Sequence, residues 1–351
     1  MSLLRRIQTD CIRSLSVVGL AKNAGKTVAL NSILRQGKAA EMTLGLSSIG
    51  YDGEKVDILT RLNKPRINVP VGTLLATATA TVSRATAKLE IAASTPYVTA
   101  LGEVIIARVR EAGEVEIAGP DSLLEMSHVV RQMQDLAADL VVVDGALDRV
   151  GSAAPTVTDA TLLSTGATVG NTLPLILRRT LHKVALFTLP AAESQAQLDL
   201  LLKAQSSGRL TYLDVEGEVT LMPFNSAMGH SLAVVDALPA KGNVILAVPG
   251  AVTDSLVSEI CRKHRLASRL TLLTHDPTHI FVSAEVWQRY LAHGGKAVVS
   301  DPIKLLAVSV NPTAPAGSSY EPRTFASALA RSLAPIPVYD LFMSDEAVTL
   351  E

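Results

Sequence analysis

Residues 14–30 read SLSVVGLAKNAGKTVAL, and this stretch decides the fold that we expect for the chain. The apolar run 15–18 predicts a short buried strand, residues 19–25 a loop of small and polar residues, and Lys26 onward a helix. A strand, a glycine-bounded loop, Gly-Lys-Thr and a helix, in this order, are typical of a phosphate-binding P-loop. The alternative is an ordinary strand-to-helix turn in which Lys26 is solvated.

The chemistry of such a loop is anion capture. Backbone N–H groups of the loop and of the helix N-terminus point at one spot, where the helix dipole favours negative charge. Lys26 would reach the β- and γ-phosphates of a nucleotide, and the Thr27 hydroxyl would ligate Mg²⁺. The residues that we expect to bind the nucleotide here are Gly19, Lys22, Asn23, Ala24, Gly25, Lys26, Thr27 and Val28.

A second motif lies far downstream, in residues 139–149, DLVVVDGALDR. Four apolar residues, 140–143, precede Asp144, which is the form of a Walker B motif: a buried parallel strand that ends in an acid. Asp144 would hold Mg²⁺ directly or through water. Gly145 would let the backbone pass close to the γ-phosphate.

Two charged residues, Asp148 and Arg149, stand just beyond this strand. A second charge at this place could orient a nucleophile or recognise a substrate. The alternative is that Asp148 and Arg149 form only a local ion pair. With Lys26 and Asp144, Asp148 completes the set of catalytic candidates.

A further acidic turn follows the next expected strand. Residues 43–49, TLGLSSI, predict the strand, and residues 50–54, GYDGE, predict a turn. Open α/β sheets bind ligands at the carboxyl ends of their strands, so the acids of this turn are candidate ligands. The alternative is a solvated turn that needs Gly and Asp only for its backbone angles. The Mg²⁺ ligands that we expect are therefore Thr27, Asp52, Glu54 and Asp144.

The order of the expected elements predicts an α/β protein. Strands and helices alternate through the first part of the chain, which indicates a doubly wound, mostly parallel sheet over residues 1–240. A second α/β rhythm indicates a C-terminal domain or extension over residues 241–351. Among the individual elements, we expect helices over 79–93, 122–138 and 171–181, strands over 103–110 and 184–189, a hairpin mate for the former over 114–118, and a hairpin over 209–221.

Composition excludes several functional classes. The chain has 351 residues and a formal net charge of -1, so no global field attracts nucleic acid. Cys11 and Cys261 lie far apart without a CxxC motif, which favours a reducing compartment with neither a disulfide framework nor a zinc site. The N-terminus lacks the apolar region of a signal peptide, and no apolar run reaches the roughly 18 residues of a membrane helix. We therefore expect a cytoplasmic protein that binds neither nucleic acid nor membranes.

Two other motifs bear on the chemistry of the chain. His275, Asp276 and His279 suggest a metal site, but Pro277 between them favours a loop with polar caps. The guanine-reading Asn-Lys-x-Asp motif of GTPases is absent, because Asn311 is followed by proline. The sequence therefore favours ATP and leaves GTP open.

The glycine loop resembles two known families. Residues 19–27, GLAKNAGKT, have the loop length of dethiobiotin synthetase, and KNAGKT within them is similar to the loop of the molybdopterin-guanine dinucleotide accessory proteins. Residues 143–146, VDGA, resemble the Glu-Gly-Ala-Gly turn of the synthetase with Asp for Glu, while Ser47-Ser48 stand where the synthetase has Lys-Pro. The first ~190 residues thus look like the P-loop class that includes this synthetase and the metallochaperone GTPases.

The whole-chain pattern resembles something narrower. GLAKNAGKT, SIGYDGE and VDGALDR together look like the proteins described as the reactivating subunit of adenosylcobalamin-dependent lysine aminomutase. This resemblance implies a factor that uses nucleotide energy to help an aminomutase shed damaged cobalamin.

Three functions remain open from the sequence. The first is a P-loop ATPase that acts as an accessory or reactivating factor for a partner enzyme. The second is an ATP-dependent small-molecule kinase or ligase of the synthetase type, and the third is a nucleotide-binding scaffold without turnover. The expected partners are a nucleotide with Mg²⁺ and a cobalamin-dependent aminomutase, and a second copy of the chain is a further candidate.

Overall fold

The computed structural model describes residues 1–49, 67–145, 154–263, 265–315 and 319–349. They form two compact units: unit 1 comprises Met1–Leu181 and Lys304–Glu351, and unit 2 comprises His182–Ile303. This division differs from the change at residue 240 that the sequence suggests. Residue 240 lies within unit 2, and the chain returns to unit 1 at Lys304 because its last strands join the sheet of that unit.

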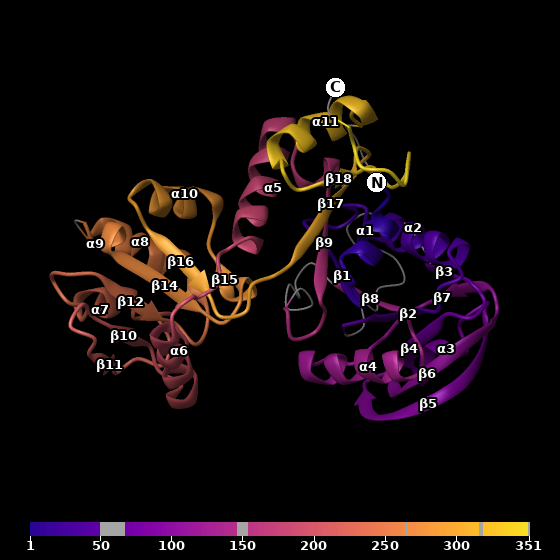
Figure 1. Ribbon diagram of the computed structural model, residues 1–351, viewed down its shortest axis with the longest axis horizontal. Coiled ribbons are helices and arrows are strands. Elements are labelled where there is room, and N and C mark those ends of the chain that lie inside the picture. Colours follow the sequence, from indigo (N-terminus) through magenta and orange to yellow (C-terminus); the bar gives the residue numbers. More distant parts are fainter. Residues whose placement is uncertain (50–66, 146–153, 264, 316–318, 350–351) are drawn as a thin grey trace. The chain divides into compact units, whose positions relative to one another are not determined.

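Unit 1 is built on a nine-stranded sheet in the order β18-β17-β9-β1-β8-β2-β4-β6-β5 (Figure 1). The strands from β18 to β4 run parallel, and β6 and β5 pair antiparallel at one edge. The expectation of an α/β protein with a mostly parallel sheet is therefore confirmed. The strands are β1 (Ser14–Gly19), β2 (Leu44–Ser48), β4 (Leu74–Ala78), β5 (Lys88–Thr99), β6 (Gly102–Glu111), β8 (Leu140–Gly145), β9 (Ala160–Gly166), β17 (Leu305–Asn311) and β18 (Val338–Tyr339), beside a separate pair of β3 (Ile67–Val69) and β7 (Gly113–Val115).

Helices cover both faces of this sheet, and the side chains of β8 show why. Leu140 and Val142 point to one face and join the core formed with α1 and α2, whereas Val141 and Val143 point to the other and pack with α4. A continuous apolar run is thus divided between two cores. The helices of unit 1 are α1 (Leu3–Thr9), α2 (Lys26–Ala39), α3 (Thr79–Val82), α4 (Leu123–Asp135) and α11 (Pro322–Leu333), with η2 (Ala167–Val169); α5 (Leu173–Phe187) crosses the boundary into unit 2.

The expected helix over residues 79–93 is wrong. Only Thr79–Val82 are helical, and residues 88–99 form the edge strand β5 instead. The apolar spacing in this stretch matches a helix, but β5 is formed by long-range pairing with β6, from Lys88 opposite Glu111 to Thr99 opposite Gly102. Tertiary pairing therefore overrides the local preference of an alanine-rich segment.

Two smaller expectations also fail. Residues 184–189 are not a strand, because α5 continues to Phe187, where the Thr188 hydroxyl donates to Val184 O in the last turn. Residues 113–115 form β7 as expected from the 114–118 segment, but β7 pairs with β3 and not with the strand that precedes it. The helix of residues 122–138 is confirmed as α4, with Ser122 as its N-cap accepting from the Glu125 N–H.

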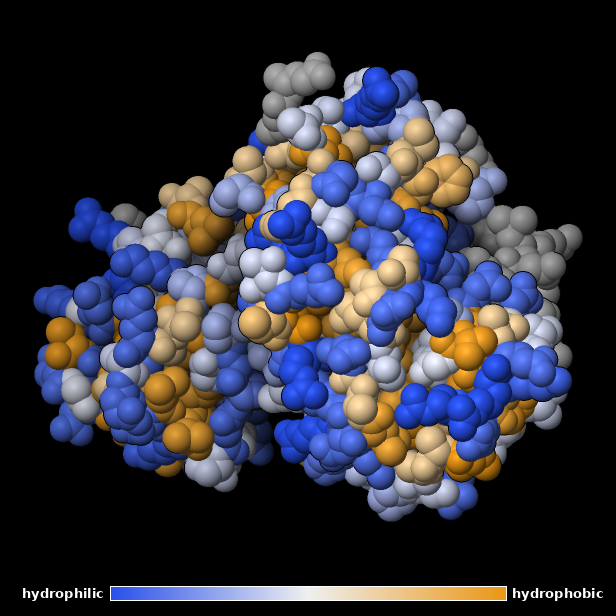
Figure 2. All heavy atoms as spheres, turned by 45° about the vertical axis from the view of Figure 1, so that its right-hand side comes forward, coloured by the Kyte–Doolittle hydropathy of each residue, from blue (hydrophilic) through white to orange (hydrophobic). Residues whose placement is uncertain are grey.

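The edge strand β5 is protected against pairing with another chain. It carries exposed Ile91 and Val98, but its pairing with β6 has three register irregularities that disturb the regular strand, and Pro96 lacks an N–H donor. Ion pairs of Lys88 with Glu111 and of Glu90 with Arg110 add charge beside the apolar groups. On the face shown in Figure 2, hydrophobic patches are interrupted by hydrophilic residues.

Unit 2 is a smaller α/β unit. Its five-stranded sheet has the order β11-β10-β12-β14-β16, in which β12, β14 and β16 are parallel and the β10–β11 hairpin confirms the expectation for residues 209–221. The strands are β10 (Thr211–Leu213), β11 (Val219–Leu221), β12 (Val244–Ala247), β14 (Leu270–Thr274) and β16 (Lys296–Val299), with a small pair of β13 (Val252–Thr253) and β15 (Ile280–Phe281). The helices are α6 (Gln195–Ser207), α7 (Ser231–Asp236), α8 (Asp254–Arg262), α9 (Leu266–Arg269) and α10 (Ala284–Ala292), with η3 (Pro277–His279).

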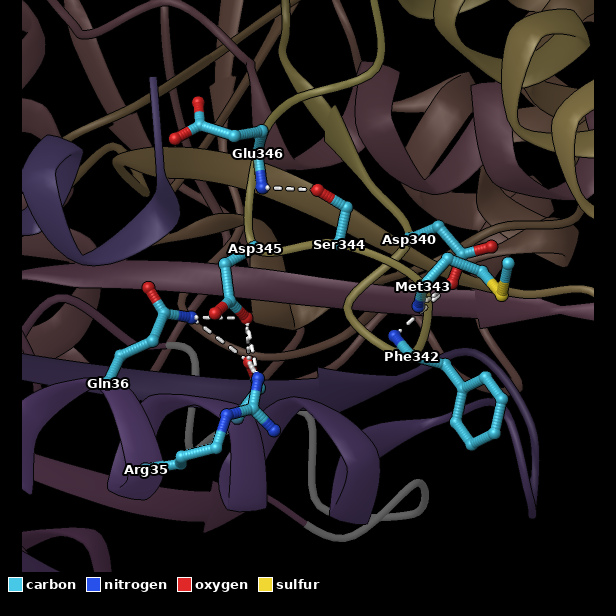
Figure 3. A network of polar contacts seen from close by, with 9 residues as sticks. Arg35, Gln36, Asp340, Phe342, Met343, Ser344, Asp345 and Glu346 are labelled. Carbon is cyan, nitrogen blue, oxygen red and sulfur yellow. Dashed lines mark hydrogen bonds and ion pairs between the residues drawn. The ribbon is translucent and has the colours of Figure 1, made fainter. Parts of the chain in front are cut away.

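The segment after β18 fastens α2 from outside the sheet. One carboxylate oxygen of Asp345 accepts from the side chains of Ser32, Arg35 and Gln36, at 2.9, 2.7 and 3.1 Å (Figure 3). The chain start joins the same segment, because the Leu3 N–H donates to Asp345 O and the N-terminal amine lies 2.6 Å from Glu346. The helix that follows the glycine loop is thus fixed by the far end of the chain.

In the part of the chain that the structure describes, no helix is long and apolar enough to span a membrane.

Removing the Asp345 carboxylate should loosen α2. Asp345→Ala leaves the buried Ser32 hydroxyl without its acceptor, so we expect a loss of about 1 kcal/mol in the free energy of unfolding. Glu346→Gln is the matched control, because its exposed ion pair with the N-terminal amine should contribute less than ~0.5 kcal/mol. Urea unfolding of the full chain measures both, and equal effects of the two substitutions would contradict this role of Asp345.

Candidate functional site

The glycine loop and the acid of the second motif meet at the carboxyl edge of two neighbouring strands. β1 and β8 are parallel, with Val17 opposite Asp144 and Val18 opposite Gly145. Asp144 continues the face of β8 on which Leu140 and Val142 pack with α2. The strand alternation therefore aims the carboxylate at the side of the sheet from which α2 starts.

The loop between β1 and α2 has a distinctive backbone. Asn23 has a φ of +59° and Gly25 a φ of +105°, both in the left-handed region. Gly25 is the N-cap of α2, and no side chain of the described residues forms a cap hydrogen bond there. Because glycine has no side chain with which to cap the helix, this N-terminus offers its backbone N–H groups in the way that anion sites at helix N-termini require.

Lys26 closes the site. Its Nζ lies 3.1 Å from Asp144 Oδ1 and also donates to the carbonyl oxygen of Gly145. The two charged side chains are 23% and 27% exposed, so the pair is only partly screened by water. Two residues far apart in the chain thereby place opposite charges beside the glycine loop.

The other expected binding residues surround this pair. Lys22 and Asn23 are exposed, Ala24 is buried, and Thr27 and Val28 lie half-buried in the first turn of α2. Gly19 ends β1 against the aliphatic stem of Lys26, where a Cβ at residue 19 would be 3.0 Å from Lys26 Cγ. The structure thus brings together all of the loop residues that the sequence indicates, with Asp144 and Gly145.

The remaining candidates cannot be placed. Asp52, Glu54, Asp148 and Arg149 lie outside the described residues. Of the expected Mg²⁺ ligands, the described ones are Thr27 and Asp144. A hydroxyl and a carboxylate are hard oxygen donors of the kind that Mg²⁺ prefers.

Sequence reasoning missed one residue at this edge. Asn311, the last residue of β17, donates from its side-chain amide to Asn23 O at 3.1 Å. It enters the sequence argument only as part of an absent GTPase motif. The available signal was an amide residue at the carboxyl end of an expected strand, where ligand sites of parallel sheets lie.

The histidines of unit 2 form a separate polar cluster at the ends of β14 and β16. His275 Nδ1 lies 3.1 Å from both Ser300 Oγ and Asp301 Oδ2, and His279 Nδ1 lies 3.4 Å from Asp276 Oδ1. Asp276 also caps η3 by accepting from the Thr278 N–H. Within the described ranges, no group of three or more His, Cys, Asp or Glu side chains could hold a metal ion.

Comparisons of the chain with protein-family models, with curated proteins and with solved structures found no match. A function for this chain is therefore inferred from the geometry of its own residues.

The Asp276–His279 pair should make unit 2 sensitive to pH. The Asp276 carboxylate, 3.4 Å from His279 Nδ1, raises the pKa of His279 above its usual 6.5, against the opposing effect of burial. Burial alone would raise the pKa of Asp276, but the nearby His279 and the hydrogen bond from the Thr278 N–H outweigh it and lower that pKa below 3.8. The stabilisation from His279 is thus full below pH 6.5 and is lost as the pH rises through the higher pKa that His279 has in the folded protein. The stabilisation from Asp276 is lost only in acid, as the pH falls through the lowered pKa of its carboxyl group.

We therefore expect His279→Gln to destabilise the protein more at pH 5.5 than at pH 8.5. Urea unfolding across this range measures the difference. In an Asp276→Asn background the same histidine substitution should show no such pH dependence. A difference that stays constant from pH 5.5 to 8.5 in the wild-type background would contradict the pairing.

Proposed function

We propose that unit 1 binds ATP with Mg²⁺ and hydrolyses it in the service of a partner enzyme. The observation that carries this proposal is the position of Lys26, which follows a left-handed glycine loop and reaches Asp144 at the end of the neighbouring strand. A turn with a solvated lysine, the alternative reading of the sequence, would not need such a partner. The geometry favours a phosphate loop over that alternative.

The phosphates would be bound by the loop backbone and by Lys26. The uncapped N–H groups at the start of α2 and the helix dipole supply preorganised donors. Lys26 would exchange its contact with Asp144 for the β- and γ-phosphates, where its charge stabilises phosphoryl transfer. The release of Lys26 would leave the Asp144 carboxylate to face the metal.

Mg²⁺ would be held by the Thr27 hydroxyl and the Asp144 carboxylate, which are oxygen donors suited to it. When bound, the ion neutralises phosphate charge during transfer. Asp52 and Glu54 as further ligands, and Asp148 as a residue that orients the nucleophile, remain predictions from the sequence. Binding of GTP in place of ATP also remains open.

A role as an accessory factor is favoured over chemistry of the synthetase type. At the end of β2, where the synthetase resemblance calls for Lys-Pro, the chain has two buried serines. Ser47 Oγ donates to Ala76 O at 3.0 Å, and Ser48 Oγ donates to Ile117 O at 3.3 Å. Small hydroxyls that are bonded to the backbone cannot replace the lysine of that motif. By its sequence resemblance, the partner that we propose is an adenosylcobalamin-dependent aminomutase.

Nucleotide binding can be tested by thermal shift. Mg-ATP at about a hundredfold its dissociation constant should stabilise the protein by roughly 2.7 kcal/mol, and the midpoint should rise by several degrees. Lys26→Ala should lose the shift, whereas Lys38→Ala, at the exposed far end of the same helix, should keep it. The same titration with Mg-GTP identifies the base. A shift that is equal in wild type and Lys26→Ala would refute the site.

The accessory role makes a separate prediction about turnover. Intrinsic ATP hydrolysis should be slow and should rise at least about tenfold when an adenosylcobalamin-dependent aminomutase carrying damaged cobalamin is added. Asp144→Asn should abolish the stimulated rate. Turnover that is unaffected by the aminomutase but appears with a small-molecule acceptor would favour the synthetase-type function instead.

A further inference from the structure

The end of β17 lies very close to the end of β9, and this close approach depends on a glycine in β9. Asn311 is paired with Gly166 of β9, and a Cβ at residue 166 would lie only 2.5 Å from Asn311 O. β9 is in turn the neighbour of β1, with Ser164 opposite Gly19. Glycine at residue 166 thus lets the strand end that carries Asn311 lie against the strands of the site.

The side chain of Asn311 lies against the two loop residues whose backbone is in the left-handed region, Asn23 and Gly25. Its Nδ2 donates to the carbonyl oxygen of Asn23 at 3.1 Å. Its Cβ lies 3.0 Å from the place that a Cβ on Gly25 would occupy. The Asn311 side chain therefore holds the backbone of Asn23 in the left-handed region, which most residues other than Gly and Asn avoid, and lies beside the N-cap of α2.

The orientation of this amide is determined by its partners. Asn311 Oδ1 accepts from both the N–H and the hydroxyl of Thr313, at 3.2 and 2.8 Å. The Thr313 N–H can only donate and the Asn23 carbonyl can only accept, so the oxygen must face Thr313 and the nitrogen must face the loop. The amide is thereby preorganised before any ligand arrives.

We propose that Asn311 is a positioning residue that holds residues 23–25 in the anion-binding conformation. It acts through the loop backbone and needs no contact with the ligand. The expected effect of Asn311 on the affinity of the loop for phosphate rests on the proposed function. The fixing of the loop can be tested on the protein without nucleotide.

The experiment compares three variants with wild type in the full chain. Asn311→Ala removes the amide, and Asn311→Asp keeps its size and its acceptor for Thr313 but places an oxygen against the Asn23 carbonyl. Ser309→Ala is the matched control, because it removes a buried hydrogen bond to Ser164 (2.8 Å) from the same strand without touching the loop. The measurements are amide hydrogen exchange of residues 20–27 without nucleotide, and titration with Mg-ATP and with tripolyphosphate.

Both Asn311 variants should speed exchange of the amides of residues 24–26 several-fold and weaken Mg-ATP and tripolyphosphate about tenfold, since one hydrogen bond and the order of the loop are lost. Ser309→Ala should leave the affinities within about twofold of wild type, even if its melting temperature falls as far as the melting temperatures of the Asn311 variants. A loss restricted to Mg-ATP, with tripolyphosphate unaffected, would mean that Asn311 contacts the nucleoside and would overturn the positioning role.

Failure of the inference can be separated from failure of the proposed function. If wild type binds neither probe, the proposed function is wrong, and exchange alone decides whether Asn311 fixes the loop. Unchanged exchange at residues 24–26 in both Asn311 variants would overturn the inference, whatever the affinities. If Asn311→Ala does not fold, Asn311→Asp, which retains the Thr313 hydrogen bonds, carries the same test.

Discussion

The parallel pairing of β1 with β8 is the constraint on which the candidate site depends. It sets Val17 opposite Asp144, so the loop that leaves β1 and the acid that ends β8 share one edge of the sheet. The alternation of β8 then turns Asp144 toward α2, and Lys26 in the first turn of that helix completes the contact. A shift of one residue in this register would turn the carboxylate to the face covered by α4 and leave Lys26 without it.

Elements that carry their own signal could be predicted from the sequence. The strand, loop and helix of residues 14–30 and the strand that ends in Asp144 combine hydrophobic pattern, glycine placement and a charged residue, and all of them appear at the expected place. Residues 79–93 carry a helical pattern but depend on β6 for their structure, so the local pattern misleads. The division into units fails for a related reason, since only the completed sheet shows that β17 and β18 belong to unit 1.

The loop and its helix are held by segments from the whole length of unit 1. Asp144 contacts Lys26, Asn311 bonds to Asn23, and Asp345 accepts from Ser32 on the outer side of α2. None of these partners is close in sequence to the loop, so the pattern of the loop itself could not indicate them. Only Asn311 carried a signal of its own, because it stands at the carboxyl end of an expected strand. The proposed anion site depends on the assembled sheet, and we expect the isolated stretch 14–30 to lack it.

The most direct test of the central claim is a crystal structure of the protein with Mg²⁺ and a non-hydrolysable ATP analogue. We predict that the β- and γ-phosphates lie within hydrogen-bond distance of Lys26 Nζ and of the backbone N–H groups of residues 24–27, with Lys26 no longer paired with Asp144 and with Asp144 facing the metal. An analogue bound elsewhere, or one bound while the contact of Lys26 with Asp144 stays at 3.1 Å, would contradict the account.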